Sequence, residues 1–409
     1  MILLDRRPSL CYIFRMIEIG WLQIILLLAA GQSILLAFGL YQKYRHLLAN
    51  RFLMALLLGY TFIFLHLVAN DLGYLTDNAY IISLMLLVPF ASNTLHFLYT
   101  RYLIRPSDHF SRRDYIHFLP ILLLGLLTLC VYGLNLPAPV ELSLGASNRS
   151  GFPRFVVINW LMILHAYLYL GQTMRLLGRY DREIRSNFST IEQIQLNWLK
   201  LISWFILSAW SIFFLENLLL LADFSLSGFA LPTFMMAVYI YIIGYMAWFK
   251  SEIFQKGDTT VSLQQLPMNQ PNSGEEESVP VASAIAEKYQ KSGLTREKME
   301  EYARQLLDYM NKHKPYREAT LNLNQLALQV NMRPYHLSEV LNVHFQKNFY
   351  DFVNQFRVEE VKNNLIDPRV KNLTILAIAF EAGFNSKAGF NTIFKKLCGM
   401  TPSQYRENH

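Results

Sequence analysis

The chain has 409 residues, of which 53% are hydrophobic and only 16% are charged. A typical soluble domain carries about 25% charged residues, so this composition argues against a wholly soluble protein and predicts membrane segments. The formal net charge of +7 favours anionic partners such as phosphate groups. The three cysteines lie far apart and form no C-x-x-C pair, which argues against a disulfide framework and against a zinc site.

Amino-acid composition divides the chain into four parts. Residues 17–249 consist of long apolar runs separated by short polar loops, whereas residues 285–409 are polar and show helical periodicity. Between them, residues 250–284 include the run QQLPMNQPNSGEEESVP, which offers almost nothing to bury and is expected to be a flexible linker. Residues 1–16 precede the first apolar run, and we expect a poorly ordered tail there or a true start at Met16.

Seven apolar segments are each long enough to cross a bilayer core, which requires about 20 mostly apolar residues per helix. The predicted spans are about residues 17–40, 52–70, 80–103, 115–135, 154–176, 199–221 and 229–249. The loops after the first, third and fifth segments carry twelve Lys and Arg residues, against two in the opposite loops. Because Lys and Arg are retained in the cytoplasm, we expect a multi-pass protein of a bacterial inner membrane with a cytoplasmic C-terminus.

Polar side chains within the apolar segments are costly in lipid and therefore mark candidate functional positions. Four of them fall toward the outer half of their segments, where they could form one polar cluster: His66, Asn159, Glu216 and Asn217. This cluster is the candidate signal site. The alternative is that the same side chains only hydrogen-bond neighbouring helices to one another.

The run LNLNQLALQVNMRPYHLSEVLNVHF, residues 321–345, predicts two short helices joined by a tight turn. A small residue, Ala327, allows the helices to approach closely, and Asn331 suits a left-handed turn. Pro334 suits the first position of the second helix, because the N–H group that proline lacks has no partner there.

The run TILAIAFEAGFNSKAGFNTIFKKL, residues 374–397, repeats this pattern. Ala379 stands four residues before Gly383, which supplies the turn, and Ser386 is placed to cap the next helix. Residues 382–406 contain no acidic residue, so the second helix would meet a phosphate backbone without repulsion.

Two spaced motifs of this region resemble the AraC-type (AraC/XylS) DNA-binding domain. They are F-x-x-x-x-N-x-x-R-V-x-x-V from Phe349 to Val361, and A-x-x-x-G-F-x-x-x-x-x-F-x-x-x-F-K-K-x-x-G-x-T-P-x-x-Y-R from Ala379 to Arg406. The resemblance covers about the last quarter of the chain. It implies two helix-turn-helix units joined by one long helix, and it implies sequence-specific binding to double-stranded DNA.

The resemblance also implies which side chains contact DNA. In the first unit the base-reading residues would be Tyr335, Ser338 and Glu339. In the second unit they would be Lys387, Ala388, Asn391 and Thr392. Phosphate contacts, which position a domain without specifying sequence, would come from Arg357, Lys395 and Lys396.

The predicted fold class is therefore all-α, with a seven-helix transmembrane bundle followed by a cytoplasmic double helix-turn-helix domain. The predicted function is a membrane-embedded one-component transcription regulator that senses a signal at or in the bundle. The alternative is a transporter or enzyme with an appended regulatory domain, but no H-E-x-x-H, G-x-S-x-G or phosphate-binding glycine loop supports an enzyme. We expect no cofactor. The expected partners are DNA, the lipid bilayer, a small ligand or a partner membrane protein, and a second copy of the chain in a homodimer.

Overall fold

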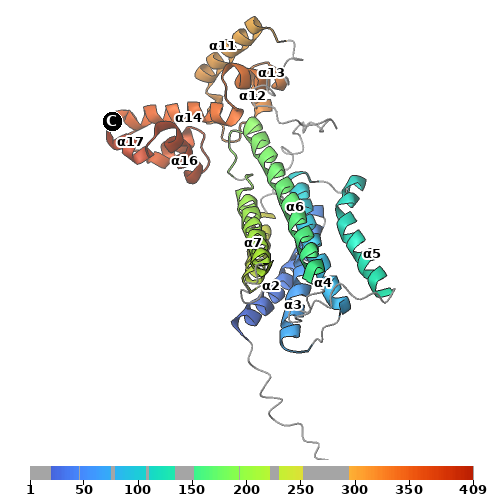
Figure 1. Cartoon of the computed structure of the whole chain (residues 1–409). Helices are drawn as coiled ribbons and strands as arrows, with labels where there is room; N and C mark the ends of the chain where they lie inside the picture. The colour runs from blue at the N-terminus through green and yellow to red at the C-terminus, as the bar shows by residue number, and fades with distance from the viewer. Residues whose placement is uncertain are drawn as a thin grey trace, which may run out of the picture. The chain divides into compact units, whose positions relative to one another are not determined.

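The computed structural model describes residues 20–45, 47–74, 79–106, 110–133, 152–192, 194–221, 230–251 and 294–408. Helices make up the regular structure of these residues, which confirms the all-α fold class for the described part of the chain (Figure 1). The predicted tail at residues 1–16 and nearly all of the predicted linker at residues 250–284 lie outside the described residues.

The described chain forms two compact units. Unit 1 comprises Met1–Gly178 and Leu196–Glu252, and unit 2 comprises Arg179–Gln195 and Ile253–His409. Unit 2 therefore differs from the predicted C-terminal domain, because it also takes in a stretch from between two of the predicted membrane segments.

Seven long helices overlap the seven predicted membrane segments. They are α2 (Trp21–Tyr44), α3 (Leu48–Asp71), α4 (Ala79–Ile104), α5 (Leu119–Gly133), α6 (Phe152–Asn187), α7 (Asn197–Leu221) and α8 (Ala230–Ser251). Within the described residues, three stretches are long and apolar enough to cross a membrane: Trp21–Gln42, Leu48–Asp71 and Asn197–Leu219. The seven-span bundle stays a prediction.

Unit 1 buries several polar side chains among its apolar ones. His96 on α4 is 2% exposed and lies with its Nε2 atom 3.1 Å from Ser203 Oγ on α7. Its Nδ1 atom lies 3.2 Å from the hydroxyl of Tyr239 on α8. Because an unpaired polar group in an apolar interior costs several kcal/mol, this chain of hydrogen bonds helps to fix α4 against α7 and α8.

The C-terminal part of unit 2 is built from two groups of helices on either side of α14 (Phe349–Ile366) (Figure 1). The first group contains α11 (Arg296–His313), η2 (Pro315–Arg317), α12 (Leu323–Gln329), α13 (Pro334–Glu339) and the π-helical turn η3 (Val340–His344). The second group contains η4 (Pro368–Val370), α15 (Ile375–Glu381), α16 (Lys387–Cys398) and α17 (Pro402–Asn408).

The turn between α12 and α13 has the predicted geometry. Asn331 has φ 54°, in the left-handed region, and Pro334 occupies the first turn of α13. Ala327 is completely buried, as the close approach of the two helices requires, and Leu337 is buried with it. The Asn322 side chain and Gln325 form a reciprocal capping box at the start of α12.

The turn between α15 and α16 requires glycine for two separate reasons. Gly383 has φ 98°, and a Cβ atom at this position would overlap the backbone carbonyl oxygen of Tyr316. Only glycine combines this backbone angle with so close an approach at little cost. Ser386 then caps α16 as predicted, because its Oγ atom accepts a hydrogen bond from the Gly389 N–H at 3.1 Å.

Candidate nucleic-acid interface

Helix α16 turns one apolar face toward the interior of unit 2 and one polar face toward solvent. Phe390 and Phe394 are 1% and 0% exposed, and Ile393 is also buried. The six residues that sequence analysis assigned to DNA contacts on this helix are all exposed: Lys387, Ala388, Asn391, Thr392, Lys395 and Lys396. An exposed face with three Lys side chains and no acidic residue can approach a phosphate backbone and present polar groups to base edges.

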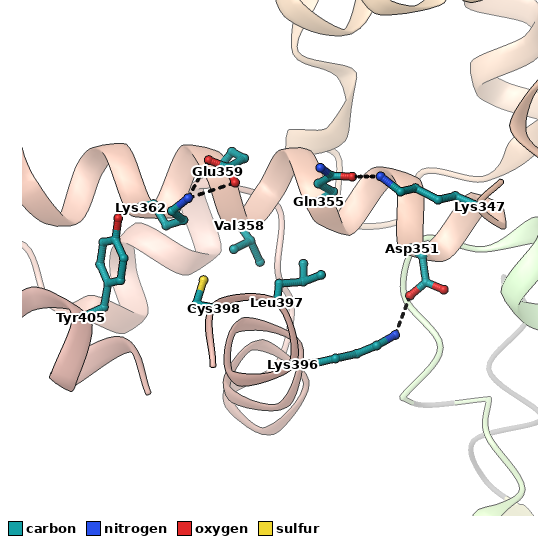
Figure 2. Close-up of a pocket in the computed structure, with 10 residues that line it drawn as sticks. All are labelled: Lys347, Asp351, Gln355, Val358, Glu359, Lys362, Lys396, Leu397, Cys398 and Tyr405. Atoms are coloured by element: carbon teal, nitrogen blue, oxygen red, sulfur yellow. Dashed lines mark hydrogen bonds and ion pairs between the residues drawn. The ribbon is translucent and has the colours of Figure 1, made fainter. Parts of the chain in front are cut away.

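Lys396, near the end of α16, forms an ion pair with an acidic residue of α14. Lys396 Nζ lies 3.0 Å from Asp351 Oδ1 on α14, and Figure 2 shows this ion pair across a groove between the two helices. Lys362 Nζ, at the other end of the groove, lies 3.0 Å from the Glu359 carboxylate. Lys396 must therefore leave Asp351 to reach a phosphate. Such surface pairs contribute only about 0–1 kcal/mol.

Helix α13 presents fewer of its assigned residues to solvent. Tyr335 is 41% exposed and Ser338 is half-buried, whereas Glu339 is only 3% exposed. The predicted base-reading role of Glu339 does not fit this burial. Helical spacing places Glu339 on the side opposite Leu337, and α11 packs against η3, the turn that follows α13.

Arg357 on α14 is also buried instead of exposed. It is 1% exposed, and its Nε atom donates to the Tyr316 carbonyl oxygen at 2.7 Å. Its Nη2 atom donates to the Glu318 carbonyl oxygen at 2.8 Å. Burial lowers the pKa of the guanidinium to about 10, so the group stays charged at neutral pH. The predicted phosphate contact does not fit this position, because α14 is covered on several sides and Arg357 holds the loop before α12.

A second charged contact of α14 was not predicted from the sequence. Glu360 is 8% exposed, and Arg317 Nε donates to its Oε1 atom at 2.9 Å. Lys314 Nζ lies 3.4 Å from the same oxygen. Burial alone would raise the pKa of Glu360, but hydrogen bonds from Arg317 and Tyr316 and the nearby positive charges lower it below its ordinary value.

Replacing Glu360 with Gln is expected to destabilise unit 2 by about 1.5–3 kcal/mol at neutral pH, since hydrogen bonds to charged groups are of this size. The pKa of Glu360 in the folded state lies below its ordinary value of 4.5. The stability that the Glu360 carboxylate contributes is therefore fully present above pH 4.5 and is lost as the pH falls through the folded-state pKa. Hydrogen-exchange protection of α14 in the full-length chain measures the effect. Glu359→Gln, which removes an exposed ion pair, is the matched control. Equal losses of hydrogen-exchange protection in Glu360→Gln and Glu359→Gln would contradict a stabilising role of the buried Glu360 carboxylate.

The candidate signal residues are only partly brought together in unit 1. Asn159 on α6 and Asn217 on α7 are 3% and 2% exposed, and Asn159 Nδ2 donates to Asn217 Oδ1 at 2.8 Å. His66 on α3 and Glu216 on α7 are half-buried. Each has a buried side-chain atom, Nδ1 and Oε2 respectively, with no hydrogen-bond partner among the described residues. The asparagine pair fits a contact between helices.

Comparison with protein families supports the C-terminal resemblance. Residues 326–408 match the family described as helix-turn-helix domain. Residues 326–408 form a helix-turn-helix domain. Within it lie α13, α14 and α16, so the exposed face of α16 belongs to a domain type that binds DNA.

Individual relatives each match a limited part of the chain. An uncharacterized HTH-type transcriptional regulator of Staphylococcus aureus (strain COL) is 34% identical over 102 residues, which are 25% of this chain and 13% of that protein. The chain thus spans about an eighth of the length of this relative. The probable transcription factor PqrA of Proteus vulgaris is 38% identical over 73 residues, 16% of this chain and 57% of that protein. A solved structure of a protein of unknown function from Listeria innocua is 25% identical and covers 26% of this chain and 95% of its own, with a TM-score of 0.23.

Proposed function

We propose that this protein is a membrane-embedded one-component transcription regulator. Its helix-turn-helix domain binds promoter DNA in the cytoplasm, and unit 1 lies in the bacterial inner membrane and senses the signal. The observation that carries the proposal is the exposed, acid-free face of α16 in a helix-turn-helix domain, on a chain whose described residues include three helices apolar enough to span a membrane.

The proposed DNA contacts follow the exposure of each side chain. Base edges are read from α13 by Tyr335 and Ser338, and from α16 by Lys387, Ala388, Asn391 and Thr392. Lys395 and Lys396 lie later in α16 and contact phosphates. Two such helices in one chain read successive major-groove faces, about 10 base pairs apart.

The proposed signal site is the group His66, Asn159, Glu216 and Asn217, with a small ligand or a partner membrane protein as the signal. Unpartnered buried atoms of His66 and Glu216 support this assignment, since native structures leave few such atoms without a functional reason. A homodimer is part of the proposal, because many DNA-binding regulators match the two-fold symmetry of their operators.

The expected topology is seven spans with the chain cytoplasmic from Lys250 onward, because the positive residues gather in alternate loops. A reporter that is active only in the cytoplasm should be active when fused after Ser251 and inactive when fused after Gly73. Activity with the opposite pattern would contradict the proposal. The alternative, a transporter, would be indicated by solute uptake that persists in a chain that ends at Ser251.

A further inference from the structure

The stretch that joins α6 to α7 is built into unit 2 by hydrogen bonds. Phe188 and Asn322 form an antiparallel bridge, and Ser189 N–H donates to the Leu321 carbonyl oxygen at 3.2 Å. The hydroxyl of Ser189 donates to the same oxygen at 2.7 Å, and that of Thr190 donates to the Ala319 carbonyl oxygen at 2.8 Å. Residues 188–192, which we term the α6–α7 segment, thus pair through their first three residues with residues 319–322 just before α12.

The α6–α7 segment also contacts the long helix α14. Asn354 Nδ2 donates to the Ser189 carbonyl oxygen at 3.0 Å. Arg357 donates to that carbonyl oxygen from Nη1 at 3.2 Å and to Ser189 Oγ from Nη2 at 3.0 Å. Ser189 is 1% exposed and Ile191 is also 1% exposed. The segment is therefore packed into unit 2 and does not merely lie on its surface.

The third contact of the α6–α7 segment is with the N-terminal turn of α16. A Cβ atom on Gly389 would overlap Glu192 Oε1, so the Glu192 carboxylate lies directly against the Gly389 backbone. The Gly389 N–H already donates to Ser386 Oγ, and the two residues before Gly389 are the proposed base-reading Lys387 and Ala388. A carboxylate is stabilised at a helix N-terminus by the same partial positive charge that attracts a DNA phosphate.

The contact of Glu192 is not an optimal one for the carboxylate. Its buried Oε2 atom has no hydrogen-bond partner among the residues that the structure describes. An unsatisfied buried acceptor weakens a contact. The docked segment is therefore held at Ser189 and Thr190 and is less well satisfied at Glu192.

We propose that the α6–α7 segment inhibits DNA binding from within the chain. When it is docked, the segment contacts the stretch before α12, helix α14 and helix α16. These contacts fix the helix pair α12–α13 relative to the helix pair α15–α16. It also places a negative charge beside the turn of α16 that must approach DNA. Released, it frees that turn. The inference rests on the proposed DNA-binding function. The segment follows α6 directly, and α6 begins in unit 1 and ends in unit 2.

A disulfide across the Phe188–Asn322 bridge tests the inhibition in a single chain. Opposed residues of an antiparallel bridge have Cα atoms about 4.5–5.5 Å apart, within the range that a disulfide spans. The full-length chain in lipid nanodiscs carries Phe188→Cys and Asn322→Cys, with serine at the native positions Cys11, Cys130 and Cys398. Binding to a fluorescent random-sequence DNA duplex is measured before and after reduction. We expect the oxidised form to bind at least about tenfold more weakly than the reduced form.

Two further variants address the charge without a cross-link. Glu192→Gln should bind the same duplex about three- to tenfold more tightly than the parent chain. Glu301→Gln, which removes the same charge from an exposed position on α11, should not. Gly389→Ala should also bind the duplex more tightly, because the added Cβ displaces the Glu192 carboxylate from α16. Alanine at this position should not disrupt α16, since it has a higher helix propensity than glycine.

Each outcome decides between the two proposals. Equal or tighter binding by the oxidised form, or unchanged affinity in Glu192→Gln, overturns the inhibition and leaves DNA binding intact. Failure of the disulfide to form in a chain that binds DNA overturns the docking of the segment. If neither the reduced form nor any variant binds the duplex, the proposed DNA-binding function fails, and the inhibition with it.

Discussion

Replacing Arg357 with Met is expected to destabilise unit 2 by about 3–5 kcal/mol. The guanidinium satisfies the carbonyl oxygens of Tyr316, Glu318 and Ser189 in a buried site, and methionine leaves all three without this donor. Each unsatisfied buried acceptor costs about 1–3 kcal/mol. The loss exceeds that of a typical substitution because one side chain serves two separate stretches of backbone, residues 316–318 and Ser189.

Hydrogen exchange of α14 amides in the full-length chain measures this loss. A destabilisation of this size lowers protection by about a hundred- to several thousandfold, because each 1.4 kcal/mol is a factor of ten. Arg369→Met is the matched control. Arg369 is 87% exposed and pairs with Asp367 on the surface, so its removal should leave the protection of α14 nearly unchanged. Near-equal protection in the two variants would show that Arg357 has no structural role and would restore the predicted phosphate contact.

The second large effect is expected in DNA affinity, where base and phosphate contacts should separate. Asn391→Ala should cost about 1–3 kcal/mol on the preferred sequence and relax preference at particular base pairs. Lys395→Ala should weaken binding to all sequences alike and reduce the salt slope by about one. Lys396→Ala should have a smaller effect than Lys395→Ala, since Lys396 must first leave Asp351.

These affinities are measured with the full-length chain on two duplexes at several salt concentrations. One duplex carries the sequence that the protein selects from a random pool, and the other carries that sequence scrambled. If Asn391→Ala and Lys395→Ala lose affinity on the two duplexes in the same proportion, the division into base-reading and phosphate-contacting residues is wrong.

Local features of the helix-turn-helix domain could be predicted from the sequence because short-range chemistry determines them. Asn331 and Gly383 adopt the left-handed backbone expected of them, and Ser386 caps α16. The exposed face of α16 follows from the 3.6-residue period, which places Phe390 and Phe394 on the buried side. In α16, spacing alone identifies the two buried Phe side chains.

Features that depend on distant parts of the chain could not be predicted in this way. Glu339 and Arg357 are polar residues whose burial depends on tertiary packing, and Arg357 is enclosed by the loop before α12. The contacts of Ser189 and Glu192 join positions more than a hundred residues apart, and the sequence around them shows no periodicity. The one local signal was glycine at position 389, inside a helix where alanine is favoured, which suggests a close approach.

Mapping the chromosomal sites bound by the intact protein in living cells tests the central claim most directly. The account predicts a small set of promoter sites that share one sequence motif with two parts about 10 base pairs apart. Recovery of these sites with the membrane fraction, and their loss in Asn391→Ala at unchanged protein level, would agree with a membrane-embedded regulator that reads base edges from α16. A protein that is folded and present in the membrane, yet enriches no DNA sequence in any condition, would contradict it.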